Sequence, residues 1–241
     1  INSASDDAAG VAISSRLSAE IRGTDQAIRN SLDGQALIDT AEGAHKEIEN
    51  ILQRMREVAV QSANDTNNAQ DRTNLQAEMN AMSTEIDRIA GTTTWAGTNL
   101  MEAATSSFSF QVGAATGAKN QIDVDIVTMN ATGLVVTTSD VDLTTDSASR
   151  LTAIDNVDAA IKSVNDQRSS LGAVSNRLNH TVNNLTNISS NLSAAKGGIE
   201  DADFALETTN LAKNQILQQA STAMLAQANA SKQNVLSLLQ G

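Results

Sequence analysis

The sequence predicts a mainly α-helical protein: a long antiparallel helical bundle or coiled coil with a small β-hairpin element at one end. Three observations predict this class. Apolar residues recur at alternating steps of three and four over two long segments, which is the spacing of a heptad seam. No proline interrupts either segment. Between them, two short runs alternate apolar and polar residues with period two, as β-strands do.

Composition excludes several classes of protein. The 241 residues contain no cysteine, which excludes a disulfide framework, a thiolate zinc site and a cysteine nucleophile. The net charge of −12 argues against a nucleic-acid-binding surface, which requires clustered lysine and arginine. No uninterrupted apolar run approaches the roughly 20 residues that span a membrane. Aromatic residues make up only 2% of the chain, so a compact aromatic core is not expected.

The first long helix is expected to run from a cap at Asp6 or Asp7 to about Ala63. Its seam consists of Ile38, Ala41, His45, Ile48, Leu52, Met55, Ala59 and Ser62, and Leu37, Ala44, Ile51 and Val58 widen the stripe. A stripe this wide implies more than one partner helix. An amide-rich turn is expected at residues 64–68. A second helix is expected after it, which ends near Gly91 and packs antiparallel to the first.

The middle of the chain predicts a small β element. Apolar and polar residues alternate along residues 108–112 and along residues 122–127, and the loop between these two runs contains two glycines. We therefore expect a β-hairpin. Residues 133–138 are a possible third strand. The Thr/Ser-rich stretch 137–149 is a candidate for O-glycosylation, and an unmodified polar loop is the plainer interpretation.

A returning helix is expected from about Ala148. Its seam holds the three-four alternation at Val157, Ile161, Val164, Arg168, Leu171, Ser175, Leu178, Val182, Leu185, Ser189, Leu192, Lys196 and Ile199. The polar members of this seam weaken pairing but restrict its register. Gly197 and Gly198 predict a hinge before the last helix.

The last helix, from about Glu200 to Leu239, is the most apolar part of the chain. We expect this helix to contact its partner through its large apolar residues, which are Leu211, Ile216, Leu217, Met224, Leu225, Val235, Leu236, Leu238 and Leu239. A lone helix with such a face has nothing to bury it in water. The sequence therefore predicts a partner for this helix.

Seven segments, in order along the chain, closely resemble bacterial flagellin. They are residues 1–10 (INSASDDAAG), 52–64 (LQRMREVAVQSAN), 110–114 (FQVGA), 168–174 (RSSLGAV), 199–204 (IEDADF), 215–220 (QILQQA) and 233–239 (QNVLSLL). The resemblance covers nearly the whole chain. Flagellins normally carry a further helix ahead of the segment that resembles residues 1–10, so the resemblance implies an N-terminally truncated flagellin.

The resemblance implies a structural subunit of the bacterial flagellar filament, which self-assembles into a helical polymer for motility and is secreted. Expected partners are further copies of the chain, a flagellar export chaperone, and the cap and hook-junction proteins. The expected organisation is residues 1–106 as N-terminal core helices with the following loop, 107–148 as the hairpin region with a short variable segment, 149–198 as the C-terminal core helix, and 199–241 as the filament-core helix.

The resemblance also implies recognition by Toll-like receptor 5 of the host. The matching positions are Arg54 and Glu78, with Val58 where flagellins often have leucine. The alternative interpretation is that Arg54 and Glu78 are solvated helix residues used in subunit packing, and both interpretations can hold together.

Several alternatives remain open on the sequence alone. A hook–filament junction protein shares the opening segment, although residues 215–220 and 233–239 favour flagellin. A flagellin-like surface protein that binds polymers is a second alternative, and a chemoreceptor hairpin lacks the β element. No catalytic motif occurs, so neither an enzyme nor a cofactor is expected. His45 and His180 are expected in packing or surface roles, and Asp123 and Asp125 on an exposed strand face rather than at a metal.

Overall fold

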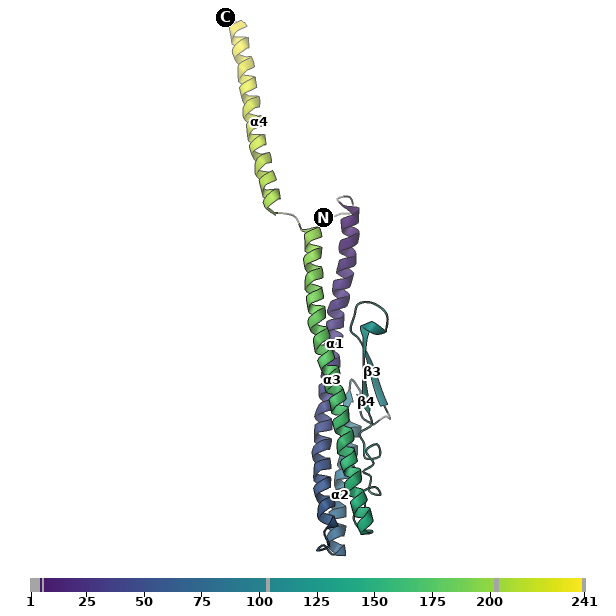
Figure 1. Ribbon diagram of the computed structural model, residues 1–241. Helices are drawn as coiled ribbons and strands as arrows, with labels where there is room; N and C mark the ends of the chain where they lie inside the picture. Colours follow the sequence, from purple (N-terminus) through teal and green to yellow (C-terminus); the bar gives the residue numbers. More distant parts are fainter. Residues whose placement is uncertain (1–4, 6, 103–104, 202–203, 240–241) are drawn as a thin grey trace. The chain divides into compact units, whose positions relative to one another are not determined.

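The computed structural model describes residues 5, 7–102, 105–201 and 204–239, with side chains as far as Ala230. In chain order its elements are α1 (Ala8–Ala63), α2 (Ala69–Thr92), β1 (Thr94–Trp95), β2 (Thr98–Asn99), β3 (Thr105–Gln111), η1 (Ala118–Asn120), β4 (Gln121–Val127), α3 (Ser147–Glu200) and α4 (Phe204–Leu239) (Figure 1). Residues 19–192 form one compact unit, and residues 1–18 with 193–241 form another. The mainly α-helical class with a small hairpin is confirmed.

Within residues 19–192, α1 and α3 run antiparallel along a buried seam (Figure 1). All eight seam residues expected on α1 are buried. On α3 the buried residues are Arg150, Ala153, Val157, Ala160, Val164, Gln167, Leu171, Leu178 and Leu185. Five of them belong to the expected seam, but Ala160 and Gln167 are buried where the sequence predicted Ile161 and Arg168, which are half-buried. The heptad spacing is therefore confirmed on α1 and only in part on α3, because residues at these steps lie on one side of a helix.

Three polar contacts fix the register of the α1–α3 pair. Arg56 Nε donates to Asp158 Oδ1 at 2.5 Å, Arg168 Nε donates to Glu42 Oε1 at 2.8 Å, and Ser189 Oγ donates to Asp25 Oδ1 at 2.8 Å. All three share one antiparallel alignment of the two helices. Two of the polar seam positions on α3, at residues 168 and 189, therefore bind α1 directly.

A capping box starts α2 immediately after the turn. The Asn68 side chain accepts hydrogen bonds from the N–H groups of Gln70 and Asp71, and the Asp71 carboxylate accepts one from Asn68 N. These bonds satisfy N–H groups that a helix start otherwise leaves unpaired. α2 then returns beside α1 and buries Met79, Ser83, Ile86 and Ala90.

Strands β3 and β4 form the predicted hairpin, with Phe110 opposite Ile122 and Thr105 opposite Val127. One face of β4 is buried, and Asp123 and Asp125 lie on its exposed face. The hairpin packs closely on α1 at Gly34, where an added Cβ would lie 3.3 Å from the Phe110 ring. A second, unpredicted ribbon pairs β1 with β2 through Ala96 and Gly97, whose positive φ values of 48° and 83° suit a two-residue turn.

The expectation of a third strand at residues 133–138 is wrong: this stretch is a turn followed by irregular chain. Side chains of α2, rather than a neighbouring strand, bind the backbone here. Ser83 Oγ donates to Val136 O at 2.9 Å, Asp87 Oδ1 accepts from Ala131 N at 2.7 Å, and Gln76 Oε1 accepts from Leu143 N at 2.6 Å. Leu134 and Val136 of this stretch are buried, whereas Val135 is exposed.

In the second unit, the expected hinge at Gly197–Gly198 is also misplaced. α3 continues through both glycines to Glu200, and the N–H of Asp201 donates to Gly197 O at 2.8 Å. A glycine inside a helix costs about 1 kcal/mol relative to alanine but does not by itself end it. Ser14 Oγ donates a hydrogen bond to Glu200 Oε1 within this unit.

Candidate assembly and receptor-binding surfaces

The described side chains of α4 leave its large apolar groups exposed. Leu211, Ile216, Leu217, Met224 and Leu225 are between 53% and 71% exposed. These are the expected assembly residues whose side chains the structure describes. Val235, Leu236, Leu238 and Leu239 belong to α4 by their backbone, and their side chains lie outside the described part.

The exposed apolar groups occupy more than one side of α4. At 100° per residue, Leu217 and Met224 fall on one line, Leu225 lies about 80° from Leu217, and Ile216 lies about 100° away in the other direction. A helix that is apolar over so wide an arc requires more than one covering surface. One neighbouring helix would therefore leave part of this surface in water.

α4 is also poor in charge. Its 36 residues contain only Glu207, Lys213 and Lys232 as charged groups, beside five glutamines and four asparagines. Neutral amides exchange hydrogen bonds within an interface without the large desolvation penalty of an ion. The composition of α4 is thus suited to burial between protein surfaces.

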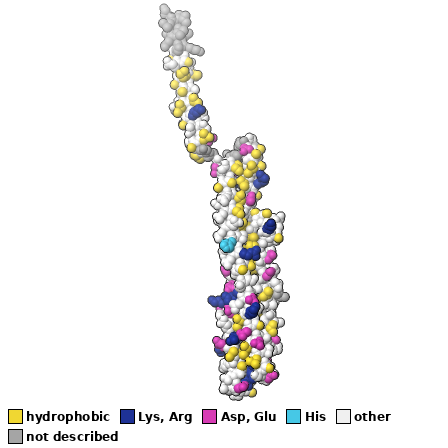
Figure 2. Space-filling view, viewed as in Figure 1, with side chains coloured by type: hydrophobic (Ala, Val, Ile, Leu, Met, Phe, Trp, Pro, Cys, Tyr) yellow, Lys and Arg dark blue, Asp and Glu magenta, His cyan; other side chains and the backbone are white. Residues whose placement is uncertain are grey.

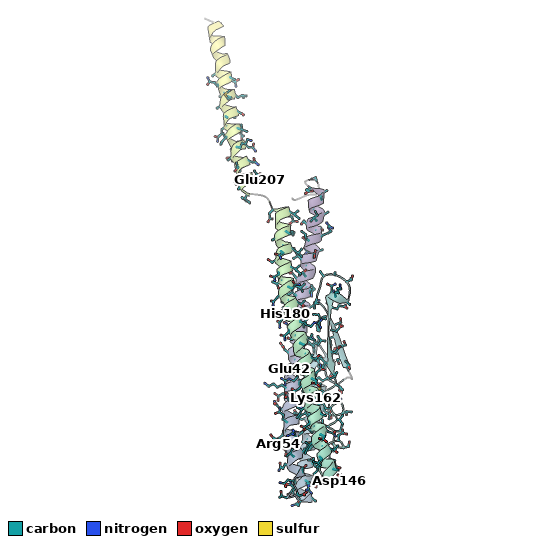
Figure 3. All side chains as sticks on the ribbon, viewed as in Figure 1. Glu42, Arg54, Asp146, Lys162, His180 and Glu207 are labelled. Atoms are coloured by element: carbon teal, nitrogen blue, oxygen red, sulfur yellow. The ribbon has the colours of Figure 1, made fainter. Side chains whose placement is uncertain are left out.

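The structure brings two of the three receptor-recognition candidates together. Arg54 Nε and Nη2 donate to Glu78 Oε1 at 3.0 and 2.8 Å, because α2 folds back beside α1. Arg54 Nη1 also donates to Glu57 Oε2 at 2.9 Å. The Glu57 and Glu78 carboxylates raise the pKa of Arg54, and its side chain remains 51% exposed on the outside of the bundle (Figure 3).

Val58, the third candidate, lies elsewhere. It is fully buried in the core cluster, together with Ala59 and Leu52. A fully buried side chain offers no surface to a receptor, so Val58 acts through packing beneath the exposed pair. The exposed candidate surface consists of Arg54, Glu57 and Glu78, and Glu57 is a member that the sequence did not single out.

A second charged cluster crosses the α1–α3 seam. The Arg168 guanidinium binds Glu42, with Nη2 at 2.7 Å from Oε1, and Nη1 binds Glu49. His45 lies between the two carboxylates along α1 and is fully buried. Among the described residues neither of its ring nitrogens has a hydrogen-bond partner.

The environment of His45 keeps its imidazole neutral. Burial lowers the pKa of His45 to about 4; the Glu42 carboxylate opposes this shift, and the Arg168 guanidinium adds to it. The expected packing role of His45 is therefore present, but its hydrogen bonds are not made. Such an orphaned polar group destabilises the fold by about 1–3 kcal/mol relative to a paired one.

Two sequence models of one family match the chain. The bacterial flagellin N-terminal helical region matches residues 1–106, and the bacterial flagellin C-terminal helical region matches residues 154–239. A flagellin of Halalkalibacterium halodurans is 47% identical over 240 residues, which cover 100% of this chain and 87% of that relative. The chain belongs to the bacterial flagellin family.

Further flagellins agree with this assignment. A flagellin of Bacillus subtilis is 42% identical over 271 residues, covering 100% of this chain and 88% of the relative. The crystal structure of Bacillus cereus flagellin superposes with a TM-score of 0.55 at 34% identity, covering 70% of this chain and 94% of that one. A flagellar hook-associated protein of Vibrio parahaemolyticus has a TM-score of 0.68 at 14% identity, covering 81% and 100%, and shows a shared fold alone.

As a flagellin, the chain is a structural subunit of the flagellar filament, the helical polymer outside the cell that serves motility. Flagellins are structural proteins and not enzymes. Among the described residues, none of the helices is both long and apolar enough to cross a membrane. The same residues contain no group of three or more His, Asp or Glu side chains placed to hold a metal ion.

Proposed function

We propose that the exposed apolar surface of α4 is the principal contact through which copies of this flagellin assemble. The observation that carries this proposal is the wide apolar arc of a helix with three charges in 36 residues. Covering one large apolar side chain contributes about 1.5–3 kcal/mol. Covering Leu211, Ile216, Leu217, Met224 and Leu225 together therefore contributes several kcal/mol per subunit.

Contacts of this kind propagate into a filament when they join different surfaces of successive copies. Such heterologous contacts do not close, so they generate an open helical lattice. Each subunit then covers the α4 surface of others and has its own covered. Val235, Leu236, Leu238 and Leu239 extend the proposed surface along the same helix.

Lysine substitutions on α4 test this proposal. Leu217→Lys with Leu225→Lys is expected to abolish filament formation, because assembly would then bury two ammonium groups without partners. Gln219→Lys is the matched control, since residue 219 lies about 160° around the helix from residue 217. Filaments are counted by electron microscopy and pelleting, and helix content is followed by circular dichroism. Normal filaments from the double variant, with helix content retained, contradict the proposal.

Before assembly, the same surface requires protection. We infer that a flagellar export chaperone covers α4 of the subunit until it is exported, because an apolar helix left bare in water promotes aggregation. The cap and the hook-junction proteins meet the terminal subunits of the filament and are inferred to contact the surfaces that a further copy would otherwise cover.

We also propose that the Arg54–Glu57–Glu78 surface is recognised by Toll-like receptor 5. Its exposure, together with a guanidinium held in fixed orientation by two carboxylates, supports this role. Arginine presents a planar set of donors that suits an interface anchor, and anchors of this type carry much of the binding energy of an interface.

The Arg54→Ala substitution is expected to weaken receptor signalling by about tenfold or more, the range of a contact worth over ~1.4 kcal/mol. Signalling by purified monomer in receptor-expressing reporter cells measures the effect. Arg88→Ala, which removes an exposed arginine that binds Glu85 on α2, is the matched control. Equal potency of the Arg54→Ala variant and the unmodified protein excludes Arg54 from the receptor site.

A further inference from the structure

A groove of about 620 Å³ lies between α1, the β1–β2 ribbon and β3, all within residues 19–192. We call it the aromatic groove, and its lining consists of Asn30, Asp33, Trp95, Ala96 and residues 109–111. The whole chain has one tryptophan and three phenylalanines, and two of these aromatic residues, Trp95 and Phe110, line this groove. Its volume lies within the range of sites that bind small molecules.

Both aromatic side chains are held in place by their surroundings. The Phe110 ring lies so close to α1 that a Cβ added at Gly34 would be 3.3 Å from it. Trp95 is half-buried and belongs to the β1–β2 ribbon. The ribbon is fixed to the end of α2 by Asn99 Nδ2, which donates to the carbonyl oxygens of residues 90 and 91 at 2.9 Å each. The groove therefore presents a ring surface that is already positioned before any ligand binds.

The amide N–H groups at the aromatic groove already have partners. Asn30 Nδ2 donates to Gln111 O at 2.9 Å, and Gln111 Nε2 donates to Gly113 O and to Ala115 O, both at 2.8 Å. Within the described part of the chain, Gln111 Oε1 accepts no hydrogen bond. This amide thus offers a ligand an acceptor and not a donor.

Asp33 supplies the negative charge of the groove lining. Its side chain is exposed, and it forms neither a hydrogen bond nor an ion pair with the residues that the structure describes. Arg29, one turn earlier on α1, donates Nε and Nη2 to Gln26 Oε1 at 3.1 and 2.7 Å instead. Asp123, which is exposed and lies opposite Ser109 in the hairpin, adds a second carboxylate to this region.

We propose that the aromatic groove binds a small organic cation that bears a guanidinium group. Such a group is planar, stacks on aromatic rings, and donates several N–H groups in one plane. Trp95 supplies the ring, and Asp33 and Gln111 Oε1 supply acceptors that have no partner in the described structure. The net charge of −12 attracts a cation from solution, and Figure 2 shows acidic side chains spread along the bundle.

A neutral saccharide is the competing class of ligand, because sugars also stack on aromatic rings. The groove favours the cation, since an unpaired carboxylate binds a charged donor more strongly than a hydroxyl group. An anion is disfavoured by the charge of Asp33 and of the whole chain. This site is separate from the exposed surface of α4, and the proposal does not depend on filament assembly.

Tryptophan fluorescence measures binding at the aromatic groove directly, because Trp95 is the one tryptophan and the chain has no tyrosine. The probe is agmatine, which carries a guanidinium and an ammonium group on a butyl chain. Added to the full chain in its monomeric form, with sodium chloride at matched ionic strength as the blank, agmatine is expected to change the fluorescence saturably with a Kd below about 1 mM. Tetramethylammonium, which cannot donate a hydrogen bond, and maltose, which is neutral, are each expected to bind at least about tenfold more weakly.

Two variants locate the binding. Asp33→Asn is expected to weaken agmatine binding at least about tenfold, because it removes the charge that faces the guanidinium. Asp39→Asn is the matched control, since it removes the same charge from an exposed position about 120° around α1 from residue 33, and its Kd should stay within about twofold of the unmodified chain. Trp95→Ala, measured by calorimetry, is expected to weaken binding at least about fivefold, with helix content checked by circular dichroism.

Three results would overturn the proposal. Without a saturable response to agmatine, the site does not exist. Equal losses in the Asp33→Asn and Asp39→Asn variants would mean that agmatine responds only to the net charge of the chain. If maltose or tetramethylammonium binds as tightly as agmatine, guanidinium is the wrong class of ligand. The proposed assembly surface is unaffected by all three, because the Leu217→Lys and Leu225→Lys variant tests it separately.

Discussion

A chain that ends at Asp201 is expected to keep residues 19–192 folded and to form no filaments. The side chains of residues 204–230 are all exposed, so their removal uncovers no core residue. The seam of α1 and α3, the packing of α2 and the hairpin all lie within residues 19–192. Loss of α4 removes the proposed assembly surface as a whole, which makes this the largest effect on polymerisation that we expect.

Sedimentation velocity, electron microscopy and thermal unfolding together measure this outcome. The shortened chain should sediment as a monomer at concentrations where the unmodified protein polymerises, and its unfolding temperature should stay within a few degrees of the unmodified monomer. Filaments from the shortened chain would show that other surfaces suffice for assembly. A large loss of thermal stability would show instead that α4 supports the fold of the bundle.

Replacing His45 by leucine is expected to stabilise the bundle by about 1–3 kcal/mol at pH 7. The substitution removes two buried ring nitrogens that have no hydrogen-bond partner in the described structure. Leucine also suits a fully buried seam position between α1 and α3. The Arg168 ion pairs to Glu42 and Glu49 remain available in this variant.

The stabilising effect of the leucine should grow as the pH falls. His45 has a pKa of about 4 in the folded chain against 6.5 as its ordinary value, so the folded state binds a proton less readily than the unfolded state. Stability of the unmodified protein therefore falls as the pH drops from about 6.5 toward 4, and this contribution is constant above that window. The difference between these two pKa values lowers the free energy of unfolding of the unmodified protein by about 3 kcal/mol once the pH lies below the pKa of the folded state.

Urea unfolding from pH 7.5 to 4.5 measures the predicted difference. It is best done in the chain that ends at Asp201, where polymerisation does not interfere. His180→Gln is the control, because it removes the other histidine of the chain at an exposed position of α3. A His45→Leu variant whose stability runs parallel to that of the unmodified chain over this range would show that His45 does not titrate as described.

The helices could be predicted from the sequence because the spacing of the apolar residues places them on one side of each helix, and that same side packs against the neighbouring helix. Seam residues three and four apart, such as Leu52, Met55 and Ala59, lie on one side of a helix and are buried there. The burial of Val58 was also present in the pattern, since it belongs to the row that widens the α1 stripe. The resemblance to flagellin identified Val58 as a receptor-recognition candidate but did not indicate that its side chain is buried.

Contacts between distant segments could not be predicted in the same way. The backbone of the loop that follows β4 is bound by Ser83 and Asp87, side chains whose partners lie 53 and 44 residues later in the chain, respectively. The possible strand at residues 133–138 therefore has no neighbouring strand in the described part of the chain. The pairing of Arg168 with Glu42 and Glu49 was likewise signalled only as a polar interruption of the seam, because sequence gives no register for the partner helix.

That pairing has a mechanical consequence. The contacts of α1 with α3 at Asp25, Glu42 and Arg56 are spread over 31 residues of α1, or about 45 Å. Sliding one helix past the other by a single heptad, about 10 Å, would break all three at once. A flagellar filament that rotates in a viscous fluid places each of its subunits under shear. A subunit whose two long helices are held together at three separated points transmits torque without one helix sliding past the other.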